Sequence, residues 1–278
     1  MIIDRNHVKN TFAEYVSHYN EKDEKVKLKI DHTYRVAELC DTIARSVKMS
    51  EKDIDLAWLC GMLHDIGRFE QIKNYGTFID AESVDHALYG VKILFNEGKI
   101  YCYLENPSDE LCDFLRKVIS CHSAYRVPKE YDERTRMFAD ILRDADKIDI
   151  LKVNVEVPLE EIYNVTTEEL MNAEVTKEVM DSFGEGNAIL RSLKKTPVDH
   201  VVGHISLVYE LVYQISVKIV QEQGYLDKLM NFPSYNPRTR KQFEELRGMM
   251  QSYIARVRLQ LRQPDVLTVH RFWMNKIH

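Results

Sequence analysis

The segment Leu63–Arg68, which reads LHDIGR, places an imidazole and a carboxylate side by side at the end of an apolar run. Burying an ionised carboxylate such as that of Asp65 is costly unless the group is paired or binds a metal. Imidazole nitrogens and carboxylate oxygens are common ligands of divalent metals. We therefore predict that His64 and Asp65 bind a metal ion.

Other histidines and aspartates could join this pair if the fold brings them to the same place. His32 lies on the apolar side of an expected helix, where a lone histidine is more often a core or surface histidine than a metal ligand. Asp146 adjoins the apolar stripe of another expected helix, whose aspartates would suit a solvated face equally well. Taken together, His32, His64, Asp65 and Asp146 offer two imidazoles and two carboxylates, which suit Mn, Fe, Co, Ni or Zn.

Helices must position these residues, because the chain shows mostly three- and four-residue apolar spacing and very little strand-like alternation. Its 278 residues include only ten Gly and seven Pro. We expect an all-α fold. Helices are expected at about residues 8–19, 32–47, 54–63, 86–95, 111–122, 138–151, 196–219 and 237–261.

Two features of this pattern lie next to the His-Asp pair. Gly67 is expected to end the helix that carries His64, since glycine favours helix C-termini. A loop is expected at 69–81, and its aromatic residues either pack in the core or cover a pocket beside the pair.

Composition excludes several classes of protein. The net charge of −6 comes without a long basic stripe, so we expect no stable nucleic-acid partner. The five cysteines show no CxxC spacing, which is typical of reduced thiols in a cytoplasmic protein. No window approaches ~18 consecutive apolar residues, and the N-terminus has no apolar signal region, so we expect no membrane association.

An isolated histidine, an apolar run that ends in HDIG and a later DADKID segment together resemble the HD-domain superfamily of metal-dependent phosphohydrolases. The resemblance covers about residues 25–155. It implies that His32, His64, Asp65 and Asp146 are metal ligands. Asp146 is chosen over Asp144 because the family's last ligand precedes a Lys/Arg-x-x-Asp sequence.

His86 and His122 resemble two additional histidines with which some HD proteins hold a second metal. The resemblance then implies two divalent metals per chain, bridged by Asp65, with Mg open beside the transition metals. The alternative is one metal, with His86 and His122 acting on the substrate or in proton transfer.

For such a centre we expect hydrolysis of a phosphomonoester or phosphodiester by a metal-bound hydroxide. Metals about 3.5–4 Å apart can hold the hydroxide and clamp the phosphoryl oxygens. Asp65, Arg68 and Lys147 are the expected catalytic residues, and Arg68, Arg126 and Lys147 are the expected substrate-binding residues. The expected substrate is a nucleotide or another small phosphorylated metabolite. The Gly-Tyr-Pro segment typical of cyclic-dinucleotide phosphodiesterases is missing from the sequence, which argues against that substrate.

Two alternatives stay open: a di-iron oxygenase of the same superfamily, and a non-catalytic module that senses a nucleotide. His200 and His204 form an HxxxH pair, but without the glutamate of HExxH we expect a packed or surface pair.

The expected organisation is an HD metal-binding helical domain at 1–155. A helical extension at 156–278 is expected to pack on it as part of one globular unit. The sequence leaves a homo-oligomer open.

Overall fold

The computed structural model describes residues 2–20, 22–158 and 165–260, and within these ranges it contains helices and no strand. The all-α prediction is therefore confirmed. The chain divides into two compact units, Met1–Asp146 and Lys147–His278. Helix α8 (Glu133–Glu156) crosses the boundary between them. The expected boundary near residue 155 and the packing of the extension on the HD domain stay predictions.

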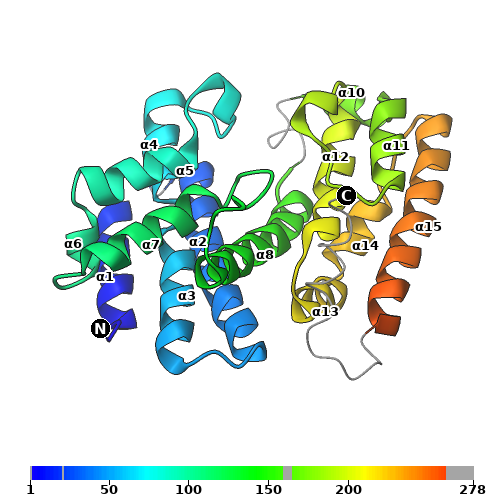
Figure 1. Cartoon of the computed structure of the whole chain (residues 1–278). Helices are drawn as coiled ribbons and strands as arrows, with labels where there is room; N and C mark the ends of the chain where they lie inside the picture. The colour runs from blue at the N-terminus through cyan, green and yellow to red at the C-terminus, as the bar shows by residue number, and fades with distance from the viewer. Residues whose placement is uncertain (1, 21, 159–164, 261–278) are drawn as a thin grey trace. The chain divides into compact units, whose positions relative to one another are not determined.

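The first unit is built around α3, which packs along α2 and also contacts α1 and α7 (Figure 1). As its sequence predicts, α3 is apolar nearly all round from Ile54 onward, and Trp58 and Leu59 in its middle are fully buried. Its N-terminus is capped by Ser50, whose side chain accepts a hydrogen bond from the Asp53 amide. The helices of this unit are α1 (Arg5–Val16), α2 (Glu24–Ser46), α3 (Glu51–Leu63), α4 (Ile66–Tyr75), α5 (His86–Val91), α6 (Ile100–Tyr103), α7 (Asp109–Ser120) and the first part of α8.

Gly67 does not end a helix. Helix α3 ends at Leu63, and Gly67 lies in the first turn of α4. A Cβ at Gly67 would collide with the carbonyl oxygen of His86 and come within 2.6 Å of the Gly90 amide nitrogen. The glycine thus permits the close backbone approach of α4 and α5, which is why the prediction of a helix stop was wrong.

Several other expected boundaries differ from the structure, and two of them lie beside the predicted ligands. The loop expected at 69–81 is helical up to Tyr75, so the loop proper follows Gly76, whose φ is +69°. Helix α2 already begins at Glu24, which places His32 in its third turn.

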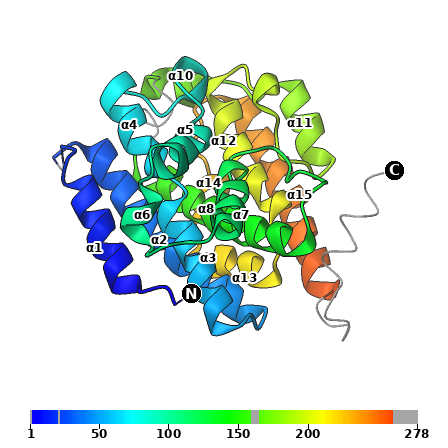
Figure 2. The same ribbon diagram turned by 60° about the vertical axis from the view of Figure 1, so that its left-hand side comes forward.

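The second unit contains α10 to α15, and Figure 2 shows α11 and α15 running side by side. The single helix expected at 196–219 is broken into α12, a 3-10 turn at Ser206–Glu210 and α13. Ser206 is buried at the break. Its Oγ donates a hydrogen bond to the Gly203 carbonyl oxygen at 2.6 Å and accepts one from the Ile189 amide at 2.9 Å. The bounds are α10 (Thr167–Asn172), α11 (Lys177–Gly184), α12 (Pro197–Ile205), α13 (Gln214–Gln223), α14 (Tyr225–Met230) and α15 (Pro237–Gln260).

Within the described ranges, every helix is too short or too polar to cross a membrane.

Candidate metal centre

Six predicted ligands from separate elements of the first unit converge on one buried place. Five of them are at most 4% exposed, and the side chain of the sixth, Asp146, is 14% exposed. The contributors are His32 in α2, His64 at the C-cap of α3, Asp65 at the N-cap of α4, His86 at the start of α5, His122 in the turn after α7, and Asp146 in α8.

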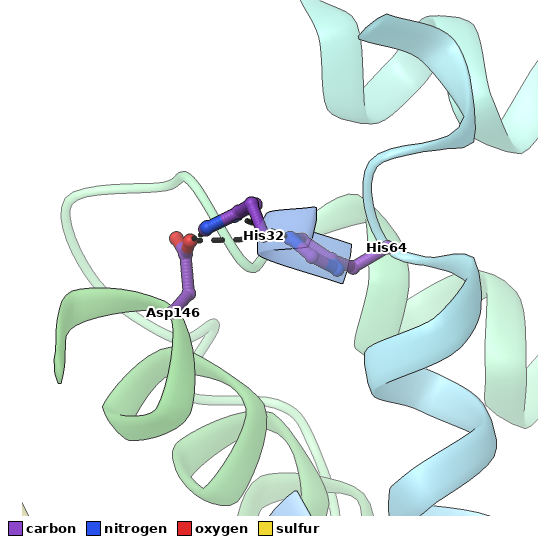
Figure 3. Close-up of side chains that lie close together, drawn as sticks. All are labelled: His32, His64 and Asp146. Carbon is purple, nitrogen blue, oxygen red and sulfur yellow. Dashed lines mark hydrogen bonds and ion pairs between the residues drawn. The ribbon is translucent and has the colours of Figure 1, made fainter. Parts of the chain in front are cut away.

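One side of the cluster is formed by His32, His64 and Asp146. The two imidazole Nε2 atoms lie 3.3 Å apart. Asp146 Oδ1 lies 3.2 Å from Nε2 of His32 and 3.9 Å from Nε2 of His64, and Figure 3 shows the carboxylate facing both rings. Three such donor atoms within reach of one another can hold a metal ion.

The other side is formed by His86 and His122, whose Nε2 atoms lie 3.0 Å apart. Asp65 stands between the two imidazole pairs. Its Oδ1 lies 3.6 Å from His86 Nε2 and 3.7 Å from His122 Nε2. Its Oδ2 lies 3.5 Å and 3.6 Å from the Nε2 atoms of the first pair. Each carboxylate oxygen therefore faces a different pair of imidazoles.

Hydrogen bonds on the far side of three rings fix which nitrogen faces the cluster. Nδ1 of His64 lies 2.8 Å from the Gly61 carbonyl oxygen, and Nδ1 of His122 lies 2.8 Å from that of Ile119. Nδ1 of His86 lies 2.8 Å from a carboxylate oxygen of Asp80. Because these oxygens only accept, we assign the proton to each Nδ1. The Nε2 lone pairs then point inward, as metal ligation requires.

The protonation states also suit a metal. Burial lowers the pKa of His64 to about 3 and that of His86 to about 4, so both rings are neutral near pH 7. Burial by itself would raise the pKa of Asp65, but Lys29 and His64, with other neighbours, hold it well below its usual value. Neutral imidazoles facing ionised carboxylates in a buried place form a donor set that a divalent cation fits.

Two positively charged side chains that are not predicted metal ligands lie beside Asp65. Lys29 Nζ lies 2.7 Å from Asp65 Oδ2, and Arg68 Nε lies 3.7 Å from Oδ1. Both cations also lie over the ring of Phe78, at 5.3 Å and 5.6 Å from its centroid. Sequence reasoning missed Lys29; the available signal was its position one turn before His32 on the same helix.

Helix α8 also supports the turn that carries His122. The buried guanidinium of Arg143 donates to the carbonyl oxygens of Cys121 at 3.1 Å and His122 at 3.3 Å. Since Arg143 lies about one turn before Asp146 on α8, it links the positions of two donors.

The remaining predicted residues make other contacts. The guanidinium of Arg126 lies over the ring of Tyr125, 4.2 Å from its centroid. Lys147 Nζ lies 3.5 Å from a carboxylate oxygen of Glu210 within the second unit. The catalytic and substrate-binding roles of Arg126 and Lys147 stay predictions. Among the described residues, neither His200 nor His204 belongs to a group of three or more donors close enough to share an ion.

Residues 30–151 match the family model of the HD domain. No curated protein matches the chain, and no solved structure matches it either.

Proposed function

We propose that this chain, which belongs to the HD-domain family through residues 30–151, is a metal-dependent phosphohydrolase acting on a small phosphoester. The observation that carries the proposal is the position of Asp65 between two pairs of imidazole nitrogens, with one carboxylate oxygen toward each pair. This arrangement suits two divalent ions that share one carboxylate. When bound, such a pair supplies an activated water and neutralises charge on the phosphoryl group.

Two bound ions would divide the donors according to which oxygen of Asp65 each donor faces. Both sets contain two neutral imidazoles and one Asp65 oxygen, and the first set has an additional carboxylate. The first set is His32, His64, Asp146 and Asp65 Oδ2, and the second is His86, His122 and Asp65 Oδ1.

Arg68 is suited to hold a phosphoryl oxygen beside this centre. Its Nη1 donates to Gln71 at 2.7 Å, to the Phe78 carbonyl oxygen at 2.8 Å and to Asp80 at 2.9 Å, so the guanidinium is fixed in orientation. Its Nε is buried and lacks a hydrogen-bond partner among the described residues. A buried N–H without an acceptor is unfavourable, and a substrate oxygen next to Asp65 would satisfy it.

Lys29 supplies a second positive charge on the same side. Its ammonium group forms an ion pair with Asp65 Oδ2, the oxygen that would be a ligand of the first ion. Because the lysine stem is flexible, the ammonium group can exchange this contact for a phosphoryl oxygen. Together Lys29 and Arg68 favour a phosphorylated substrate over a neutral one, and nucleotides are the class we propose first.

The test uses the purified full chain loaded separately with Mn²⁺, Fe²⁺, Co²⁺, Ni²⁺ or Zn²⁺. Phosphate release is measured on a panel of nucleotides and other phosphoesters, and bound metal is measured by elemental analysis. Asp65→Ala should lose both bound metal and activity, because it removes the carboxylate common to both donor sets. Asp181→Ala, at an exposed aspartate of α11, is the control and should keep both. Full activity in protein stripped of metal would contradict the proposal.

The second candidate is a di-iron oxygenase, because four imidazoles and two carboxylates also suit a pair of iron ions. The two bordering cations favour hydrolysis of a phosphoester. Phosphate release by the iron-loaded protein without oxygen would decide for hydrolysis, whereas strictly oxygen-dependent turnover would decide for the oxygenase.

A further inference from the structure

We propose that Asp80, in the loop between α4 and α5, is a positioning residue that aligns His86 for metal binding and Arg68 for phosphate binding. The inference rests on the proposed function, since it assigns Asp80 a role toward the same metal pair and substrate. Asp80 was not among the residues predicted from the sequence, and its carboxylate lies outside the two donor sets.

The carboxylate of Asp80 joins three donors. Its Oδ2 lies 2.8 Å from His86 Nδ1, while its Oδ1 accepts from Arg68 Nη1 at 2.9 Å and from Gln71 Nε2 at 3.0 Å. The Asp80 side chain is only 11% exposed, so these bonds are largely shielded from water. One largely shielded carboxylate therefore contacts both a predicted metal ligand and the proposed phosphate-binding arginine.

His86 depends on this contact more than its neighbours depend on theirs. The Nδ1 atoms of His64 and His122 face backbone carbonyl oxygens three residues earlier in the chain, in the last turns of α3 and α7. The Nδ1 of His86 instead faces a side chain from the preceding loop, and α5 begins only at His86. Asp80 therefore fixes both the tautomer and the ring orientation that direct Nε2 toward Asp65.

Gln71 and Arg68 hold Asp80 in turn. Gln71 is fully buried, and its Nε2 also reaches Ser83 Oγ at 2.8 Å and the Val84 carbonyl oxygen at 3.1 Å. These hydrogen bonds attach the loop to α4 and so fix the position of Asp80 relative to that helix. The loop therefore connects α4 to His86, the first residue of α5, through Asp80.

Asp80, Asp85 and His86 also lie close enough together to be considered as a separate cation site. Their hydrogen bonds argue against it. Both oxygens of Asp80 already accept from the three donors, and Asp85 Oδ1 caps α5 by accepting from the Leu88 amide at 3.0 Å. We therefore assign Asp80 to positioning.

The decisive variant is Asp80→Asn in the full chain. An amide is the same size as the carboxylate but has one acceptor oxygen, so either His86 or the Arg68–Gln71 pair must face an NH₂ group. Mn²⁺ binding is measured from the electron paramagnetic resonance signal of free Mn²⁺, which requires no turnover. We expect one ion to bind as in the wild type and the second to bind about 10–100-fold more weakly. KM for an active phosphoester should also rise, because the neutral amide no longer attracts the Arg68 guanidinium as the carboxylate does.

Asp85→Asn is the matched control, because it changes the same charge next to His86 and keeps an oxygen for the α5 cap. It should bind both ions with wild-type affinity. Circular dichroism establishes that each variant is folded. If Asp80→Asn does not fold, Asp80→Glu takes its place, since the longer stem moves the carboxylate off His86 Nδ1.

Two wild-type-like Mn²⁺ affinities and an unchanged KM in the folded Asp80 variant would overturn the inference while leaving the proposed function intact. Equal losses in Asp85→Asn would also overturn it, because local charge would then be the cause. A wild-type chain that binds no metal ion would instead overturn the proposed function, and this inference with it.

Discussion

At the scale of single residues, Lys29 has the most direct influence on what Asp65 can bind. Its ammonium group lies 2.7 Å from Asp65 Oδ2, and its side chain is only 16% exposed. A charge at this place repels a metal ion and attracts a phosphoryl oxygen. Lys29 should therefore lower the affinity for metal and raise the affinity for a phosphorylated substrate.

Lys29→Met keeps most of the stem and removes the charge. We expect KM for an active phosphoester to rise about 10-fold or more, as for loss of a hydrogen bond to a charged group. The affinity for Mn²⁺ should stay the same or increase. Steady-state kinetics and Mn²⁺ titration check the two effects separately. Lys27→Met, at an exposed lysine of the same helix, should change neither, and an unchanged KM in Lys29→Met would contradict the assignment.

The convergence of the six side chains could be expected from the sequence, whereas their role as metal ligands stays a prediction. His64 and Asp65 end an apolar run, and His32, His86, His122 and Asp146 stand in the order that the resemblance to the HD family implies. Lys29 lies one turn before His32, but the sequence does not distinguish it from the other charged residues at 21–29, and Asp80 lies in an expected loop whose conformation the sequence does not give. Only the folded structure shows that they contact Asp65 and His86.

At the scale of elements, the close approach of α4 and α5 sets the distance between Asp65 and His86. Gly67 permits that approach, since a Cβ there would meet the backbone of Gly90 at 2.6 Å and collide with the His86 carbonyl oxygen. Backbone atoms cannot rotate away as a flexible side chain can. A side chain at residue 67 must therefore push the two helices apart.

Gly67→Ala should lower the free energy of unfolding by about 1–3 kcal/mol, as overpacking does. It should also weaken binding of the ion between His86 and His122 by separating them from Asp65. Urea unfolding and Mn²⁺ titration measure the two effects. Gly248→Ala in α15 is the matched control, because a Cβ there meets no atom within 4 Å. That control should be neutral or stabilising by up to about 1 kcal/mol, and similar losses in both variants would contradict the packing argument.

Helices with a continuous apolar stripe could be predicted from the sequence, and α3 and the start of α15 lie where their patterns indicated. Boundaries set by tertiary contacts could not. The residue pattern gives no sign that Gly67 serves a helix contact, nor that Ser206 bonds across to Ile189 where the helix breaks. The expected helix end at residue 261 lies outside the described residues.

At the scale of the whole molecule, all six donors belong to the unit Met1–Asp146. The second unit, Lys147–His278, therefore contributes no residue to the proposed donor sets. The match to the HD domain ends at residue 151, five residues past the unit boundary. The proposed metal chemistry thus belongs to the first unit, and the sequence pattern of the second unit does not indicate its role.

The donor set also couples the stability of the metal-free protein to pH. His64 and His86 have pKa values of about 3 and about 4 in the folded chain, while an unfolded histidine titrates near pH 6.5. Between these values the unfolded chain binds protons that the folded chain excludes. Stability is therefore fully present above about pH 6.5 and is lost as the pH falls toward about 4.

We expect each of the two histidines to lower the free energy of unfolding by about 2 kcal/mol at pH 5 relative to pH 7. Urea unfolding of metal-free protein at pH 7, 6 and 5, followed by circular dichroism, measures the loss. His86→Gln removes one of the two histidines. The free energy of unfolding of this variant should therefore fall about 2 kcal/mol less than that of the wild type between pH 7 and pH 5. A wild-type stability that does not fall between pH 7 and pH 5 would contradict the prediction, because two neutral buried imidazoles require that fall.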